Sequence, residues 1–193
     1  MIVTAFSSSD ESSFETITNP VTGDRMTILH SAQTNDGAYA KFQFDLPPGA
    51  KGSPLHYHTR MSETFTVLQG CLEMEVGRKG NVRMLRAGER LEVPPGVPHS
   101  FRNPSNEWVT FTSENRPATG FDRFIRGMFG LAIDGKVNPE GMPTNLLQFA
   151  LLIQQADLVL VGPPRVLQML LIGGLAQLGR LIGVERSLLK YWR

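Results

Sequence analysis

The sequence predicts a mainly β protein, a small antiparallel barrel or sandwich followed by C-terminal helices. Short runs of alternating apolar and polar residues, separated by turn signals, occupy the chain up to about residue 116. Beyond Arg116-Pro117 the alternation stops and helical spacing begins. We therefore divide the chain into residues 1–116, a β-barrel with an N-terminal arm, and residues 117–193, a helical extension.

The clearest strand is predicted over residues 38–46, where Ala40, Phe42, Phe44 and Leu46 alternate with polar residues. Before it, residues 35–37 read Asn-Asp-Gly and predict a hairpin turn. The polar residues 6–24 predict an arm that pairs with a sheet edge through residues 25–30. Further strands are expected at residues 63–67, 72–76, 91–93, 99–102 and 108–113, with another hairpin turn at 78–81.

A group of potential metal ligands lies within the stretch from residue 49 to residue 70. His56 and His58 are separated by one residue, so on a strand both imidazoles point to the same face. Their Cα atoms would be roughly 6.6 Å apart, which lets both rings approach one ion. Glu63 opens the next strand after a polar turn, and its carboxylate can swing back toward the two histidines.

A second stretch, residues 88–103, supplies a further imidazole. Pro94-Pro95-Gly96 forces a turn, and His99 then begins another extended run. Three histidines and one glutamate suit a single divalent Fe, Mn, Ni, Cu or Zn ion, and ligand type alone does not choose among these metals. An isolated His-x-His pair is more often structural than ligating, but Glu63 and His99 favour a metal site. His30 has no partner in either stretch and is expected to be a solvated or core residue.

These two stretches resemble the paired motifs of the cupin family. The first motif is matched by His56, His58, Glu63 and Gly70, with one departure, since Gly49 lies one residue upstream of the expected leading glycine. The second motif is matched throughout by Gly88, Pro94, Gly96, His99 and Asn103. The resemblance covers about residues 38–113. It implies an antiparallel double-stranded β-helix, the cupin or jelly-roll barrel, with a metal ion inside.

The resemblance is to small single-domain (type-2), quercetinase-like cupins, and it implies dioxygenase, oxidase, decarboxylase or isomerase chemistry. We expect a metal-dependent, dioxygenase-like oxidoreductase acting on a small, oxygen-bearing, aromatic or apolar substrate. Glu63 is the candidate catalytic residue because a carboxylate can act both as a ligand and as a proton acceptor. The alternatives are a non-catalytic metal or small-molecule binding module and a metal-assisted isomerase or cyclase. Inward apolar residues suggest the substrate pocket, or else ordinary barrel core: Phe42, Phe44, Phe65, Val67, Met74, Leu91 and Phe101.

Composition narrows the choice of partners and compartment. Lys and Arg number 19 against 18 Asp and Glu, so no global field attracts nucleic acid or an anionic membrane. The single cysteine, Cys71, excludes an internal disulfide and fits a reducing compartment. The first residues lack the features of a secretory signal, so we expect a cytoplasmic protein.

The helical extension is the part that a minimal barrel does not explain. Helices are predicted from residue 121 to about 129, from 145 to about 161 and from 165 to about 189. The third is almost wholly apolar and contains Gly173, Gly174, Gly179 and Gly183, which suggests close packing against another surface. We favour packing on the barrel or in a homodimer. Partial membrane association is less favoured because Arg180 and two glutamines interrupt the apolar run, and a flexible tail is the third alternative.

Overall fold

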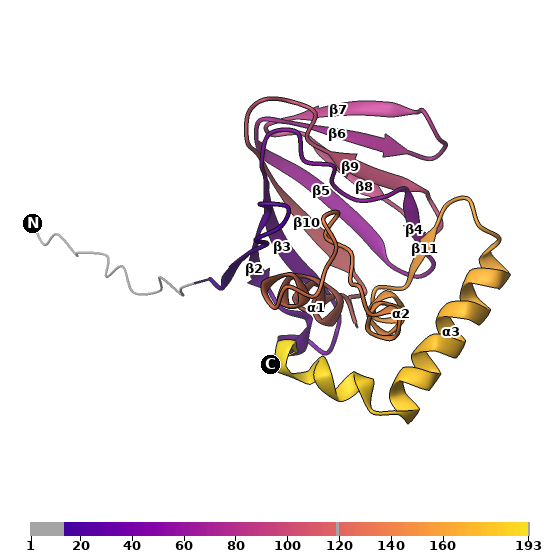
Figure 1. Cartoon of the computed structure of the whole chain (residues 1–193). Coiled ribbons are helices and arrows are strands. Elements are labelled where there is room, and N and C mark those ends of the chain that lie inside the picture. Colours follow the sequence, from indigo (N-terminus) through magenta and orange to yellow (C-terminus); the bar gives the residue numbers. More distant parts are fainter. Residues whose placement is uncertain (1–13, 119, 193) are drawn as a thin grey trace, which may run out of the picture.

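The structure, a computed structural model, describes residues 14–118 and 120–192 and contains two antiparallel β-sheets with helices at the C-terminal end (Figure 1). One sheet has the strand order β1-β2-β3-β10-β5-β8 and the other β11-β4-β9-β6-β7. The predicted fold class is confirmed. The boundary between residues 116 and 117 stays a prediction, and the polar residues 6–13 lie outside the described residues. The strands are β1 (Thr16–Thr18), β2 (Arg25–His30), β3 (Ala40–Leu46), β4 (His56–His58), β5 (Ser62–Gln69), β6 (Cys71–Val76), β7 (Val82–Arg86), β8 (Arg90–Val93), β9 (His99–Arg102), β10 (Val109–Arg116) and β11 (Leu158–Leu160).

The main core lies between the two sheets and follows the predicted alternation. On β3, every second residue from Ala40 to Leu46 is buried. On β5, Glu63, Phe65 and Val67 share the buried face. Burial of these apolar side chains is the chief source of the barrel's stability. The same alternation directs Glu63 to the inside.

Strand β10 is longer than predicted, and this extension bears on the site. It continues through Arg116 because it pairs with β3 on one side and β5 on the other, which satisfies its backbone hydrogen bonds. In the register, Phe65 lies opposite Ser113 and Glu63 lies opposite Asn115. Two polar side chains therefore enter the interior beside Glu63.

The helices are α1 (Phe121–Ile133), α2 (Leu146–Gln155) and α3 (Arg165–Leu181), with short 3-10 turns at Ala32–Thr34, Val184–Ser187 and Leu189–Tyr191. Helix α1 begins where predicted, and Asn145 caps α2 by accepting hydrogen bonds from the backbone N–H groups of Leu147 and Gln148. The prediction that the second helix reaches about residue 161 is wrong. The helix stops at Gln155, Asp157 adopts a left-handed φ of 50°, and the chain then forms β11. It does so because the edge of β4 is open and the strand satisfies backbone groups on both segments.

Helix α3 begins as predicted but ends at Leu181, before the expected end near residue 189, because Gly183 takes a left-handed φ of 80°. Close packing at the glycines is confirmed at Gly179, where a Cβ would lie 3.1 Å from Leu151 Cδ1, and not at Gly174, where a Cβ would meet nothing within 4 Å. One face of α3 is left uncovered: Val166 is 70%, Leu170 70% and Leu181 74% exposed.

Partial membrane association is the less favoured alternative for the apolar C-terminal segment. Within residues 14–118 and 120–192, no single helix is long and apolar enough to cross a membrane. Helix α3 taken with Val184–Tyr191 reaches that length and composition only as a pair bent by 82°.

Candidate metal centre

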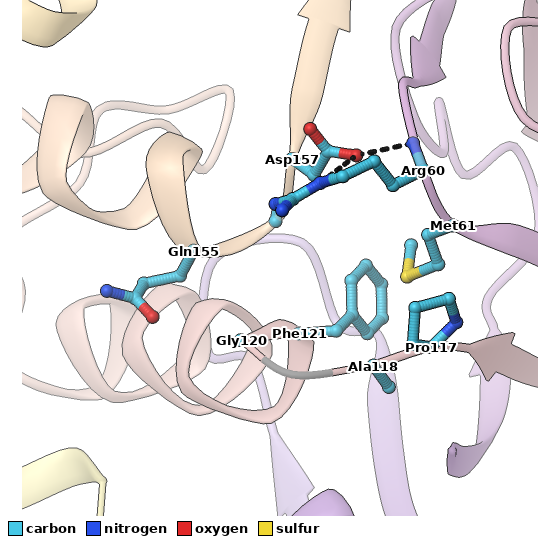
Figure 2. Close-up of a pocket in the computed structure, with 9 residues that line it drawn as sticks. Arg60, Met61, Pro117, Ala118, Gly120, Phe121, Gln155 and Asp157 are labelled. Atoms are coloured by element: carbon cyan, nitrogen blue, oxygen red, sulfur yellow. Dashed lines mark hydrogen bonds and ion pairs between the residues drawn. The ribbon is translucent and has the colours of Figure 1, made fainter. Parts of the chain in front are cut away.

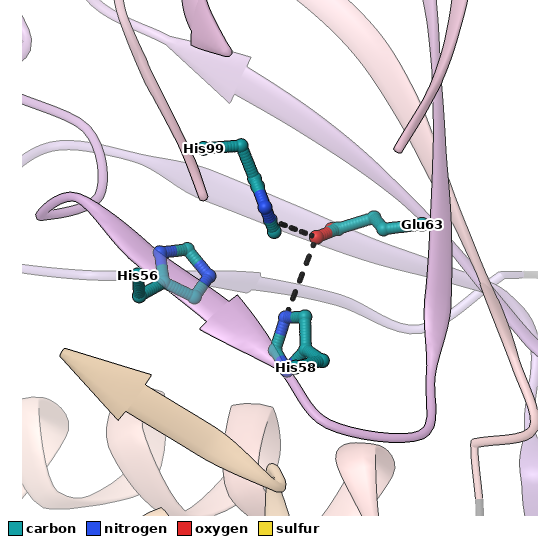
Figure 3. A group of neighbouring side chains, drawn as sticks. All are labelled: His56, His58, Glu63 and His99. Carbon is teal, nitrogen blue, oxygen red and sulfur yellow. Dashed lines mark hydrogen bonds and ion pairs between the residues drawn. The ribbon is translucent and has the colours of Figure 1, made fainter. Parts of the chain in front are cut away.

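Three strands bring the predicted ligands to one point in the barrel interior. His56 and His58 come from β4, Glu63 from β5 and His99 from β9 (Figure 3). Residues His56 and His99 face each other across the β4–β9 pair. All four side chains are buried, and one potential ligand atom from each lies within 4.8 Å of the others. The strand pairing therefore assembles the four residues that the motifs single out.

Each imidazole is oriented by a backbone carbonyl. The Nδ1 atom of His56 lies 2.8 Å from the Pro54 oxygen, that of His58 lies 2.9 Å from the Ala156 oxygen, and that of His99 lies 3.0 Å from the Val97 oxygen. A carbonyl only accepts, so each Nδ1 carries the proton and donates it. The other ring nitrogen, Nε2, is then the atom available to a metal ion, although that of His99 is engaged with Glu63 and would have to exchange this hydrogen bond for the ion.

The arrangement around Glu63 fits a bound cation. The Nε2 atom of His99 lies 3.0 Å from Glu63 Oε2, whereas that of His58 lies 3.6 Å away, beyond an ordinary hydrogen bond. His58 Nε2 is buried and has no hydrogen-bond partner among the described residues. A buried imidazole nitrogen without a partner is costly, and a metal ion between it and the carboxylate would remove that cost. The donor set of three nitrogens and one oxygen suits a divalent transition metal.

His56 and Glu63 are in the protonation states that bind metal ions, whereas Glu63 favours a proton on His99 that an ion would displace. Burial, followed by the nearby His99 and His58, lowers the pKa of His56 to about 3, so this imidazole is neutral. Burial alone would raise the pKa of Glu63, but the two imidazoles beside it outweigh burial and lower it, so the carboxylate is ionised. Burial alone would lower the pKa of His99, but the hydrogen bond with Glu63, the charge of Glu63 and the Val97 carbonyl together outweigh burial and raise it. A neutral imidazole and an anionic carboxylate are the forms that bind metal ions.

Two residues on β10 orient Glu63, and sequence analysis did not identify them. The hydroxyl of Ser113 donates to Glu63 Oε1 at 2.6 Å, and the side-chain amide of Asn115 donates to Ser113 Oγ at 3.0 Å. Both residues are buried. The available signal was that Ser113 and Asn115 continue the inward positions of Val109 and Phe111 along the same strand, which is unusual for polar side chains without a partner.

The remaining motif residues support the fold and lie outside the ligand set. The Asn103 amide donates to the carbonyls of Pro47 and Glu107 at 2.8 and 2.7 Å and so ties two loops together. In the loop before β4, Gly52 has a φ of 62° and approaches the Phe101 backbone so closely that a Cβ would lie 1.8 Å from the Phe101 carbonyl oxygen. His30 is exposed on β2 beside the ring of Tyr39 and does not join the site.

A cavity of about 200 Å³ adjoins the site, and Glu63 lines it. Of the predicted pocket residues, Phe44 and Phe101 line this cavity, whereas Phe42, Phe65, Val67 and Met74 are fully buried core and Leu91 packs against that core. The rest of the apolar wall comes from α1, which includes Phe121 and Phe124. Helical spacing predicted an apolar face for this helix but not which surface the face would cover.

The cavity also has polar lining residues. Asp24 and Thr22 line it, and Asp24 Oδ1 and Thr22 Oγ1 are buried without a hydrogen-bond partner in the described part of the chain. Burial raises the pKa of Asp24 to about 6. The lining of the cavity thus combines apolar, aromatic side chains with Glu63 of the candidate metal centre and with a second polar group.

Comparison with known proteins shows which family and which curated protein this chain resembles. Residues 42–113 match the family described as the cupin domain. The probable oxidoreductase virH of Hypocrea virens is 29% identical over 157 residues, which cover 75% of this chain and 70% of that protein.

Two solved structures cover about half of the chain. An RmlC-like cupin from Shewanella frigidimarina is 24% identical with a TM-score of 0.46, over 57% of this chain and 89% of its own. A sugar phosphate isomerase of the cupin superfamily from Silicibacter pomeroyi is 22% identical with a TM-score of 0.47, over 55% of this chain and 73% of its own. The family match at residues 42–113 contains the complete His56, His58, Glu63 and His99 set within paired sheets, and this region of the chain is a cupin domain.

Proposed function

We propose that this protein is a metal-dependent oxidoreductase, dioxygenase-like in its chemistry, that acts on a small, oxygen-bearing and mainly apolar substrate. His56, His58, Glu63 and His99 would hold one divalent transition metal ion. The observation that carries the proposal is the convergence of these four buried donors beside an apolar cavity. A bound ion of this kind supplies Lewis acidity and, where it is redox-active, one-electron chemistry.

The cavity walls support a substrate with an aromatic or similarly flat apolar body. Phe44 and Phe101 from the sheets and Phe121 and Phe124 from α1 all line this space. Aromatic walls favour stacked or edge-on contacts with an aromatic ligand. A volume of about 200 Å³ limits the substrate to a small molecule.

The polar groups that line the cavity would orient such a substrate. The unpartnered Asp24 oxygen can accept a hydrogen bond from a substrate hydroxyl, while Glu63 faces the same space from the candidate metal centre. Glu63 is held by Ser113 on one oxygen, which leaves the other oxygen to serve as a ligand or to accept a proton. The similarity to a protein named as a probable oxidoreductase supports redox chemistry over isomerisation.

Metal content is the first test. Protein purified without a metal-affinity step is analysed by mass spectrometry of its metals, beside a His56→Ala, His58→Ala double variant and a His30→Ala control. We expect near-stoichiometric iron, manganese, nickel or copper in the wild type and in the control, and its loss in the double variant. Absence of bound metal even after reconstitution would refute the proposal.

Oxygen consumption then tests the reaction class. The reconstituted protein is screened with small diphenols and diketones, and Glu63→Gln is compared with the wild type. Turnover that requires oxygen and is lost in Glu63→Gln supports the oxidoreductase. Ligand binding that survives in Glu63→Gln without any turnover would indicate a binding module, and conversion without oxygen uptake would indicate an isomerase or cyclase. The homodimer and the cytoplasmic location stay predictions.

A further inference from the structure

We propose that the C-terminal extension is part of the metal centre, with Asp157 as a positioning residue for His58. The inference rests on the proposed metal site. The inference adds a role for residues 156–160, which lie outside both motifs and outside the matched cupin region. The segment runs along the strand that carries His56 and His58 (Figure 1).

The orienting carbonyl of His58 differs in origin from those of the other two histidines. His56 and His99 each bond to a carbonyl two residues earlier in the chain, so the segment just before each strand supplies the partner. His58 bonds to the Ala156 carbonyl, 98 residues away. A barrel without the extension would lack this acceptor. His58 would then lose the contact that directs its protonated Nδ1 away from the site and its Nε2 toward Glu63.

Asp157 ties down the chain immediately after His58. Its carboxylate accepts hydrogen bonds from the backbone N–H of Thr59 at 2.9 Å, the backbone N–H of Arg60 at 2.8 Å and the Thr59 hydroxyl at 2.7 Å. The Arg60 guanidinium lies 3.7 Å from the same carboxylate (Figure 2). These contacts fix the turn between β4 and β5, which is the connection between the ligands His58 and Glu63. A carboxylate that accepts several hydrogen bonds holds such a turn more firmly than a neutral group would.

Strand pairing sets the position of Ala156 relative to His58. In the antiparallel register Leu158 lies opposite His58 and Leu160 lies opposite His56, and the backbone N–H of Val161 donates to the Leu55 carbonyl at 3.0 Å. The outer edge of β11 is covered by the side-chain amide of Gln168 on α3. This amide accepts from the Leu160 N–H at 3.1 Å and donates to the Leu160 carbonyl at 2.9 Å. The segment is therefore fixed on both edges, as positioning of a ligand requires.

If Asp157 only stabilised the fold, its replacement would weaken metal binding no more than the loss of another anchor of the extension. Asp134 is such an anchor and provides the matched control. Asp134 lies in the same extension and accepts hydrogen bonds from Tyr191 at 2.6 Å and Lys136 at 3.0 Å, so it too fastens this part of the fold. It contacts neither β4 nor β11 in the described structure. A variant at Asp134 reports the effect of loosening the extension without disturbing His58.

The test measures Co(II) affinity in the full-length protein. Asp157→Gly, Asp157→Asn and Asp134→Ala are compared with the wild type by chelator competition, by the visible absorption spectrum of the Co(II) form and by melting of the metal-free protein. Glycine is chosen because Asp157 has a left-handed φ of 50° that an alanine would strain, and asparagine tolerates this conformation while keeping one acceptor oxygen.

We expect Asp157→Gly to bind Co(II) about 10- to 100-fold more weakly and to change its spectrum, as loss of groups that orient ligands generally does. Asp157→Asn should recover part of the affinity, and Asp134→Ala should stay within about twofold of the wild type even where its melting temperature falls. Wild-type affinity in Asp157→Gly, or an equal loss in Asp134→Ala, would overturn the inference. Either result leaves the proposed function intact, because that proposal is tested by metal binding and oxygen-dependent turnover of the wild type, which these variants do not change.

Discussion

Replacing Ser113 with alanine tests whether β10 positions the glutamate of the metal centre. The Ser113 hydroxyl donates to Glu63 Oε1 at 2.6 Å, both side chains are buried, and the substitution leaves that carboxylate oxygen without its donor. Hydrogen bonds to charged groups contribute about 1.5–3 kcal/mol, so the free energy of unfolding of the metal-free protein should fall by about that amount. The lost orientation of Glu63 should also weaken metal binding about 10- to 100-fold.

The assay separates the two effects. Denaturant unfolding of the metal-free protein gives the change in stability, and chelator competition gives the change in metal affinity. Ser62→Ala is the matched control, because the Ser62 hydroxyl donates to the Arg116 carbonyl on the exposed side of β5, one residue before Glu63. A loss of stability with metal affinity unchanged within twofold would refute a positioning role for Ser113, and an equal loss of affinity in the control would refute its specificity.

Three further predictions concern the loop beside the site, the cavity and α3. Gly52→Ala should lower the free energy of unfolding by about 2–4 kcal/mol, because its Cβ would clash with the Phe101 backbone. Gly80→Ala, whose Cβ would face open space, should lower it by only about 1 kcal/mol. Equal losses of the two variants in chemical denaturation would contradict this prediction. Burial raises the pKa of Asp24 to about 6, so the native state binds this proton more tightly than the unfolded chain, and stability from this group is lost as pH rises from about 4 to about 6. Asp24→Asn should therefore gain about 1–2 kcal/mol relative to the wild type between pH 4 and pH 7, and a pH-independent difference would exclude the effect. If the predicted homodimer forms through α3, Leu170→Lys should convert it to monomers in light scattering, and a wild-type monomer would remove the basis of that prediction.

The ligand set could be predicted because its determinants are local. Strand alternation alone places His56 and His58 on one face and turns Glu63 inward, and the Pro-Pro-Gly turn fixes where the strand of His99 begins. Each of these features depends on residues a few positions apart, so the chain sequence is sufficient to state them.

The groups around the ligands could not be predicted, because they depend on which distant segments become neighbours. Ser113 reaches Glu63 through the register of β10 against β5, across 50 positions of the chain. Ala156 reaches His58 across 98 positions, and only because α2 stops early enough for β11 to pair with β4. Local propensity favoured continuing that helix, and the backbone hydrogen bonds available at the open edge of β4 outweighed it.

The sequence by itself therefore determined the barrel class, the four candidate ligands and the apolar character of the C-terminal helices, since periodicity and motif spacing are properties of short segments. Only the tertiary structure decided which face of α1 closes the cavity, which carbonyl orients His58 and which side of α3 stays exposed. These outcomes depend on strand register and on which surfaces pack against one another. Burial and hydrogen bonding between distant segments decide both.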